Sequence, residues 1–115
     1  MEKDLEQRTK RFALAAIKLV GSLPRGAASD ILGRQVLRSA TSIGANYREA
    51  NRAVSSPDFT NKIGTVQKEA AETQYCLELL IESGIVKDSS VADLHRESTE
   101  LLLAIFTSIG RKLKE

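Results

Sequence analysis

The sequence predicts an all-α fold, an antiparallel up-down-up-down four-helix bundle. Apolar residues recur at steps of three and four in four long segments, and no segment alternates apolar and polar residues over enough positions to predict a strand. The two prolines, Pro24 and Pro57, lie at the edges of these segments. Long amphipathic helices with short connections pack as antiparallel neighbours. With 115 residues, the chain is expected to form a single domain over residues 1–115.

The first helix is expected over residues 4–20, because Asp4 is a candidate N-cap at the start of a periodic apolar segment. A break rich in glycine precedes the second helix, which is expected over residues 30–53. Ser29 and Asp30 suit its start, since a serine can cap the first turn and a carboxylate is stabilised by the positive end of the helix dipole.

The third helix is expected over residues 57–83, with Pro57 at the tolerated first position and Gly84 just after the end. The fourth helix is expected over residues 90–113. Its main apolar stripe is predicted to consist of Val91, Leu94, Ser98, Leu101, Ile105 and Ile109. The residues expected to flank this stripe are Leu102, Phe106 and Leu113.

Composition excludes several classes of protein. The single cysteine, Cys76, leaves no internal disulfide and no thiol cluster for zinc. The charged first residues predict no signal peptide, and no apolar run approaches the roughly 20 residues that span a bilayer. We therefore expect a cytoplasmic protein with no membrane partner.

Charge is distributed unevenly along the chain, although the formal net charge is only +2. Residues 1–54 carry ten Lys or Arg against five Asp or Glu, whereas residues 55–115 carry seven against ten. Such asymmetry indicates either a nucleic-acid partner or complementary surfaces on two subunits.

Basic residues form stripes on the first two helices. At about 100° per residue, four arginines of the second helix fall within about 40° of one line, opposite to Ile43. They are Arg34, Arg38, Arg48 and Arg52. The first helix has a similar cluster, Arg8, Arg11 and Lys18, with Lys10 nearby. Guanidinium groups at this spacing suit backbone phosphates, because each offers planar bidentate donors, so all seven cluster members are candidate nucleic-acid contacts. The alternative is a solvated or subunit-contact face, the usual place for charged helix residues.

The third helix supplies the opposite charge through Glu69, Glu72, Glu78 and Glu82. The acidic face of one subunit is expected to lie on the basic second-helix face of another, a heterologous contact that closes into a ring where the rotation allows. Gly44 is expected to permit close approach of a neighbouring helix or subunit, which would offset its cost of about 1 kcal/mol in a helix.

The remaining polar residues indicate structural roles. Asn46 and Glu49 lie one turn apart and are expected to form an inter-helix hydrogen-bond pair that fixes helix register. The one histidine, His95, is expected to be a surface or capping residue, and Ala92 precedes it where a di-iron bundle needs a glutamate. No nucleophile elbow and no glycine-rich phosphate loop is present. We expect no catalytic residue, no metal and no cofactor.

Two stretches of the sequence resemble a known family. "LRSATSIGANYREANRAVSSPDF" followed by "KIGTVQKEAAETQYCLELLIESG" is similar to the 23S ribosomal RNA intervening-sequence proteins, over roughly residues 10–85. The resemblance implies a four-helix bundle that assembles into a homo-oligomeric ring, typically a pentamer. It also implies kinship with the accessory protein of diversity-generating retroelements, whose basic ring is thought to bind nucleic acid and a reverse transcriptase. The family has no established catalytic activity and no agreed site.

Residues and resemblance together lead to two functional expectations. The first is a non-enzymatic, ring-forming protein that binds RNA or another nucleic acid through phosphate contacts from a basic face. The second is a structural or adaptor oligomer that binds a protein partner and has no nucleic-acid role.

Overall fold

The computed structural model describes the backbone of residues 2–114 and the side chains of residues 4–99 and 102–113. Within this range the chain forms four helical rods and no strand, which confirms the all-α prediction. The first three rods are α1 (Glu2–Gly21), α2 (Ala27–Ala50) and α3 (Ser56–Glu82). The fourth rod consists of three segments in succession, α4 (Asp88–Arg96), η1 (Glu97–Leu103) and α5 (Ala104–Lys114).

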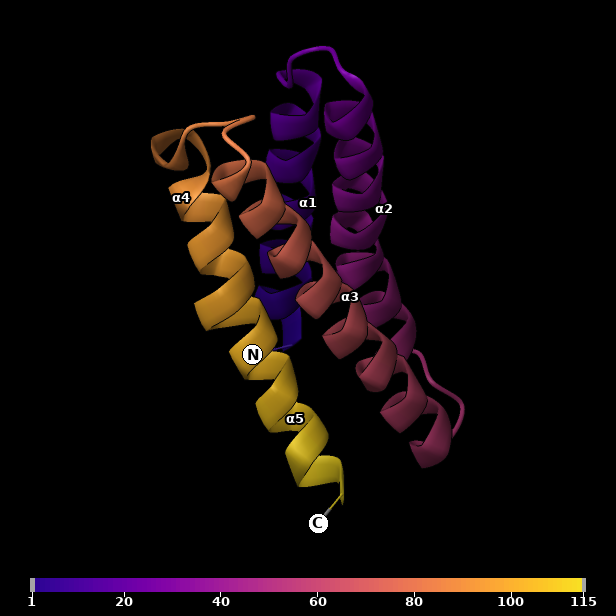
Figure 1. The fold of residues 1–115 in the computed structure, drawn as a ribbon. Coiled ribbons are helices and arrows are strands. Elements are labelled where there is room, and N and C mark those ends of the chain that lie inside the picture. The colour runs from indigo at the N-terminus through magenta and orange to yellow at the C-terminus, as the bar shows by residue number, and fades with distance from the viewer. Residues whose placement is uncertain (1, 115) are drawn as a thin grey trace.

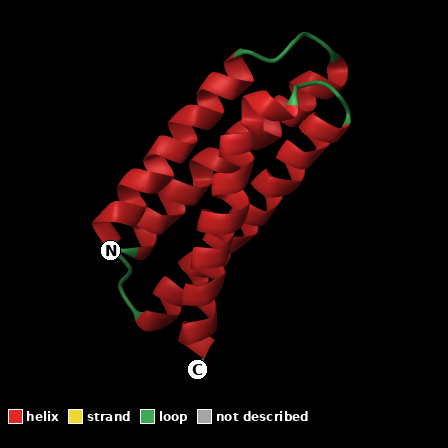
Figure 2. Ribbon diagram, turned by 90° about the vertical axis from the view of Figure 1, so that its left-hand side faces the viewer, coloured by secondary structure: helices red, strands yellow, loops and turns green. Residues whose placement is uncertain are grey.

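The rods lie side by side in a body of 44 × 21 × 20 Å. Figure 1 shows the α1–α2 and α3–α4 connections at one end of the molecule and the α2–α3 connection at the other. Figure 2, from the side, shows that the loops are confined to these ends. The most extensive packing is between α2 and α3, followed by that between α1 and α2.

The start of α2 differs from the prediction. The helix begins at Ala27, three residues earlier than expected, and ends at Ala50. Gly26 precedes it with a φ of 154°, a backbone conformation that residues with a side chain rarely adopt. The buried hydroxyl of Ser29 donates to the Pro24 carbonyl at 2.6 Å. Ser29 therefore stabilises the α1–α2 loop and does not cap the helix.

The start of α3 has a side-chain cap. The Ser55 hydroxyl accepts a hydrogen bond from the Asp58 amide at 3.2 Å, and the Asp58 carboxylate accepts one from the Val54 amide at 3.3 Å. Pro57 lies in the first turn, where its missing N–H leaves no intrahelical bond unmade. These contacts end the α2–α3 loop and set the direction of α3.

The fourth rod contains a π-helix, η1, which the sequence pattern did not predict. Its hydrogen bonds run from i to i+5, so its turns are wider than α-helical turns. As a result, the buried positions after Ser98 are Leu102, Phe106 and Gly110, at steps of four. The prediction was wrong here, since Leu102 and Phe106 were expected to flank the stripe. Ile105 and Ile109 are only half-buried, and the Leu101 side chain lies outside the described residues.

The core runs along the whole bundle and receives side chains from all four rods. Ile43 of α2, Ile63 and Leu77 of α3, and Phe106 of α5 are among the largest side chains that are fully buried. The rings of Tyr47 and Phe106 meet edge to face, with centroids 5.2 Å apart. Tyr47 is 2% exposed, so its ring is part of this core.

Gly44 contacts a helix of its own chain. A Cβ atom built on Gly44 would lie 3.1 Å from Oγ1 of Thr9 in α1. The close approach predicted at this glycine is therefore confirmed for a neighbouring helix. Because Gly44 is buried by α1, its small size is explained without a second subunit.

A buried hydroxyl pair joins α2 to α3. The Thr73 hydroxyl donates to the Ser39 hydroxyl at 2.7 Å, and both residues have no exposed surface. The residues predicted for this role have separate partners: Asn46 donates to the Ser42 carbonyl of its own helix at 2.9 Å, and Glu49 accepts from Lys62 of α3 at 2.8 Å. Asn46 and Glu49 thus do not form a pair, and only Glu49 bridges two helices.

The Thr73→Val substitution is expected to lower the free energy of unfolding by about 1–2 kcal/mol, because it leaves the buried Ser39 hydroxyl with only a 3.4 Å bond to the Val36 carbonyl. Urea denaturation followed by circular dichroism measures the loss. Thr65→Val is the matched control, since the Thr65 hydroxyl bonds only to the Asn61 carbonyl of its own helix and is expected to cost less. The Ser39→Ala/Thr73→Val double variant should cost less than the sum of the single changes; strict additivity would contradict the coupling.

Candidate nucleic-acid interface

The outer side of α1 and α2 carries a basic surface, here called the α1/α2 face. It consists of Lys10 from α1, Arg25 from the α1–α2 loop, Arg34 and Arg48 from α2, and Arg52 from the turn after α2, all exposed. The second helix was expected to continue to residue 53, so the structure places Arg52 just beyond the helix. Two shallow hollows follow the seam between the helices. One, of about 340 Å³, includes Arg25 and Arg34, and the other, of about 320 Å³, includes Lys10 and Arg48.

Most cations of the α1/α2 face form no ion pair, although Asp30 lines the same hollow as Arg25 and Arg34. Among the described side chains, no carboxylate lies within 4 Å of Lys10, Arg25, Arg34 or Arg52. Arg48 is the exception, with Nε 3.9 Å from a Glu6 carboxylate oxygen, a long and partly exposed contact that contributes little. The face therefore presents positive charge to solvent along α2.

Arg38 differs from the other arginines of the predicted stripe. Its guanidinium donates to the carboxylates of Glu69, at 3.3 Å, and Glu72, both on α3 of the same chain. The hydrogen bond to Glu72 and the negative charge of Glu69 raise the pKa of Arg38 above its ordinary value. Arg38 is thus neutralised within the chain, and the stripe of four arginines becomes one of three.

Three of the four acidic residues on the α3 face, all except Glu82, have partners in their own chain. Glu69 and Glu72 hold Arg38, and a carboxylate oxygen of Glu78 lies 3.5 Å from Nε2 of His95. His95 was expected to be a surface or capping residue. It is instead half-buried against α3. Glu69, Glu72 and Glu78 thus pair within the chain, and their contact with another subunit stays a prediction.

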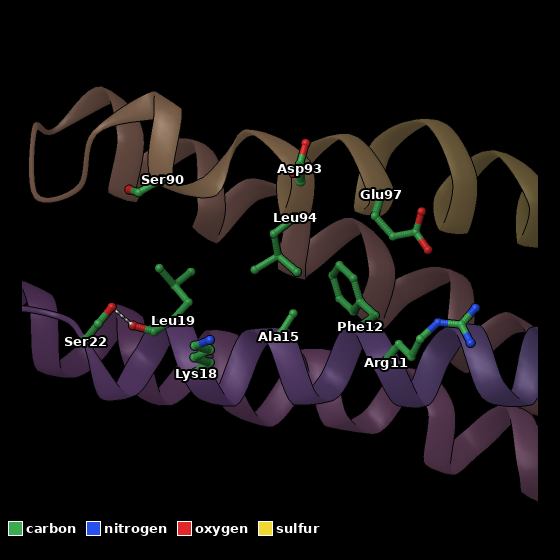
Figure 3. A pocket seen from close by; sticks show the side chains of 10 residues that line it. All are labelled: Arg11, Phe12, Ala15, Lys18, Leu19, Ser22, Ser90, Asp93, Leu94 and Glu97. Atoms are coloured by element: carbon green, nitrogen blue, oxygen red, sulfur yellow. Dashed lines mark hydrogen bonds between the residues drawn. The ribbon is translucent and has the colours of Figure 1, made fainter.

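The basic cluster of α1 lies on a different side of the molecule from the α1/α2 face. Arg8 donates to the Glu97 carboxylate at 2.9 Å, which ties α1 to the fourth rod. Arg11 and Lys18 line a groove between α1 and α4, here called the α1/α4 groove (Figure 3). The structure therefore does not bring Arg8, Arg11 and Lys18 together with Arg34, Arg48 and Arg52.

Lys10 and Arg25 belong to the α1/α2 face in the structure, but the sequence pattern did not group them with the arginines of α2. Lys10 could have been found from the helix angle, because it lies about 100° from Arg11, on the side of α1 that faces Thr41 and Arg48 of α2. Arg25 could not, since it lies in a loop to which no helical period applies.

The described side chains contain no group of three or more His, Cys, Asp or Glu that could hold a metal ion. Burial raises the pKa of the Cys76 thiol, and the thiol lies 3.5 Å from the Gln35 amide oxygen. A thiol of raised pKa is a poor nucleophile near neutral pH. Over the described part of the chain, no helix combines the length and apolar character needed to cross a bilayer.

The fold and this face define an all-α four-helix protein whose candidate site is a charged surface. The chain matches the family model of the 23S rRNA-intervening sequence protein over residues 2–107, and it belongs to that family. It is also similar to a protein of unknown function from the S23 ribosomal protein family of Bacteroides thetaiotaomicron VPI-5482, solved by crystallography. The two are 36% identical with a TM-score of 0.85, over 96% of this chain and 99% of the other. No curated protein matches the chain.

Proposed function

We propose that this chain is a non-enzymatic, cytoplasmic protein that binds RNA through phosphate contacts from the α1/α2 face. One observation carries the proposal: Arg34 and Arg48 on α2 and Arg52 in the turn that follows are all exposed, and Arg34 and Arg52 have no carboxylate within 4 Å among the described side chains. Arg52 lies next to Arg48, since its guanidinium donates to the Arg48 carbonyl at 3.1 Å. From Arg34 to Arg48 the stripe extends about 21 Å along α2 at 1.5 Å per residue, and Arg52 follows beyond the helix end, so the row is long enough for several successive phosphates. Free guanidinium groups bind phosphate oxygens with two parallel hydrogen bonds.

The proposal includes assembly. We infer an antiparallel up-down-up-down bundle that forms a homo-oligomeric ring, expected to be a pentamer. Leu14, Ile17 and Tyr75 are 56%, 48% and 60% exposed, and exposed apolar side chains of this size favour a contact with another chain. Gly64 is exposed on α3, and no atom of the described residues lies within 4 Å of a built Cβ, so none of them compensates its cost of about 1 kcal/mol. A neighbouring subunit that packs closely there would.

The test measures mass and RNA binding together. The protein is purified with and without nuclease treatment of the lysate. Light scattering measures the molar mass of each preparation, and each is then titrated with labelled single-stranded and duplex RNA. We expect an oligomer in both preparations. The logarithm of the RNA-binding constant should fall linearly with the logarithm of the salt concentration. The slope should be about 0.7 per neutralised phosphate for single strands and, by analogy with B-form DNA, about 0.9 for duplexes. Absence of RNA retention at about 50 mM salt, with the oligomer intact, would support the adaptor function and remove this one.

A further inference from the structure

The α1/α4 groove is a second surface feature, separate from the α1/α2 face. It has a volume of about 490 Å³ and a mainly apolar lining. Figure 3 shows Phe12, Ala15 and Leu19 of α1 and Leu94 of α4 pointing toward one another across it. The groove follows α1 from Phe12 to Ser22, about 15 Å at 1.5 Å per residue.

Local sequence explains why the groove stays open. Ala15 is small and exposed at the middle of the α1 wall, and at one end only the short side chains of Ser22 and Ser90 line the groove. At the other end, the ion pair of Arg8 with Glu97 joins the helices. The fourth rod packs mainly on α3, and α1 mainly on α2, so α1 and α4 are held apart.

The two rims of the groove differ in available charge. On the rim formed by the fourth rod, Asp93 of α4 is paired with Arg96 at 3.3 Å, and Glu97 of η1 is paired with Arg8. On the α1 rim, Arg11 and Lys18 lie seven residues apart, two turns along one side of the helix. Neither has a carboxylate within 4 Å among the described side chains. The groove thus offers an apolar floor with free positive charge along one edge.

We propose that the α1/α4 groove binds an amphipathic helix of a partner protein, with glutamate or aspartate at positions two turns apart on the edge that faces Arg11 and Lys18. An apolar floor parallel to two helices suits apolar residues at helical spacing, as in other helix-in-groove complexes. A nucleic acid does not suit this floor, because phosphates would lie against Phe12 and Leu19.

A second copy of the chain fits the groove less well than an acidic helix. Among the described side chains, the exposed large apolar residues that lie within one turn of each other are Leu14 and Ile17 of α1. Lys10 and Lys18 lie within one turn of this pair on the same helix. Docking that surface into the groove would bring it against Arg11 and Lys18, so like charges would meet. The proposal stands apart from RNA binding, since no residue of the α1/α2 face lines the groove.

The probe is a fluorescein-labelled helical peptide of about three heptads, with leucine at a and d and glutamate along one flank. Fluorescence anisotropy with the full chain is expected to show micromolar binding, at least about tenfold tighter than a peptide with lysine in place of glutamate. Ala15→Trp, which fills the groove from an exposed position, should weaken binding about tenfold or more. The control Ala104→Trp, at an exposed position of α5, should leave it unchanged, and neither variant should alter RNA affinity.

A variant with exchanged charges tests whether loss of binding reflects loss of the groove's charge or only misfolding of the protein. The Arg11→Glu/Lys18→Glu variant should bind the lysine peptide more tightly than the glutamate peptide, which a merely unfolded protein would not do. Equal binding of the two peptides, no effect of Ala15→Trp, or no reversal by the charge exchange would overturn the proposal. So would a fall in oligomer mass on adding the peptide, because a second copy would then occupy the groove.

Discussion

The Arg34→Ala/Arg48→Ala/Arg52→Ala variant is expected to bind RNA at least about tenfold more weakly than the unaltered protein. The slope of log affinity against log salt should also fall by about one for each phosphate that is no longer neutralised, hence by about two to three for the triple change. These three side chains are exposed, so their removal should leave the bundle folded. Filter binding at several salt concentrations measures the slope, and circular dichroism measures the fold.

The control for this variant removes the same number of charges elsewhere. Lys68 of α3, Lys87 of the α3–α4 loop and Lys112 of α5 are exposed, and their replacement by alanine should change RNA affinity much less. Equal effects in both variants would mean that net charge, and no particular face, attracts RNA. If the arginine variant instead dissociates into monomers, the stripe serves assembly.

Arg38 is kept in this variant because the structure assigns it a different task. The sequence placed Arg38 on the same line as Arg34 and Arg52, and the helix angle was right. An angle on one helix, however, does not say which residue of the next helix lies opposite. Only the register between α2 and α3 brings Glu69 and Glu72 to Arg38. Spacing within helices could therefore predict the cations but not which of them are neutralised.

The helices themselves were predictable because their apolar period is a property of each segment alone. The same holds for Gly44, whose lack of a side chain indicated a close neighbour, although only the structure identifies that neighbour as Thr9. Arg11 and Lys18 were grouped correctly on one side of the first helix. That side faces α4, and this depends on how the four rods are arranged around the core.

The wide turn of η1 is the feature that sequence spacing could least reveal. If residues 97–103 are taken as α-helical, the spacing predicts that Ile105 and Ile109 point to the core. In the structure Leu102 and Phe106 are the buried residues. A π-helix leaves no fixed composition signal, because it changes the hydrogen-bond partner by one residue and not the residue types. Phe106 therefore separates the two alternatives in an experiment.

Phe106→Ala is expected to lower the free energy of unfolding by about 3–5 kcal/mol, a large part of the roughly 5–15 kcal/mol that stabilises a small domain. Phe106 has no exposed surface and packs edge to face on Tyr47, so its truncation leaves a cavity and also removes the interaction between the two rings. Urea denaturation at fixed protein concentration measures the change, since assembly would add to the apparent stability.

Ile105→Ala is the matched comparison, because it truncates the adjacent, half-buried residue and should cost less than Phe106→Ala. Phe106→Leu should keep most of the stability, at a cost under about 1.5 kcal/mol, since it retains much of the buried volume. If Ile105→Ala costs more than Phe106→Ala, the fourth rod continues as an unbroken α-helix through residues 97–103. The stripe predicted from the sequence would then be the correct one, and η1 would not exist in solution.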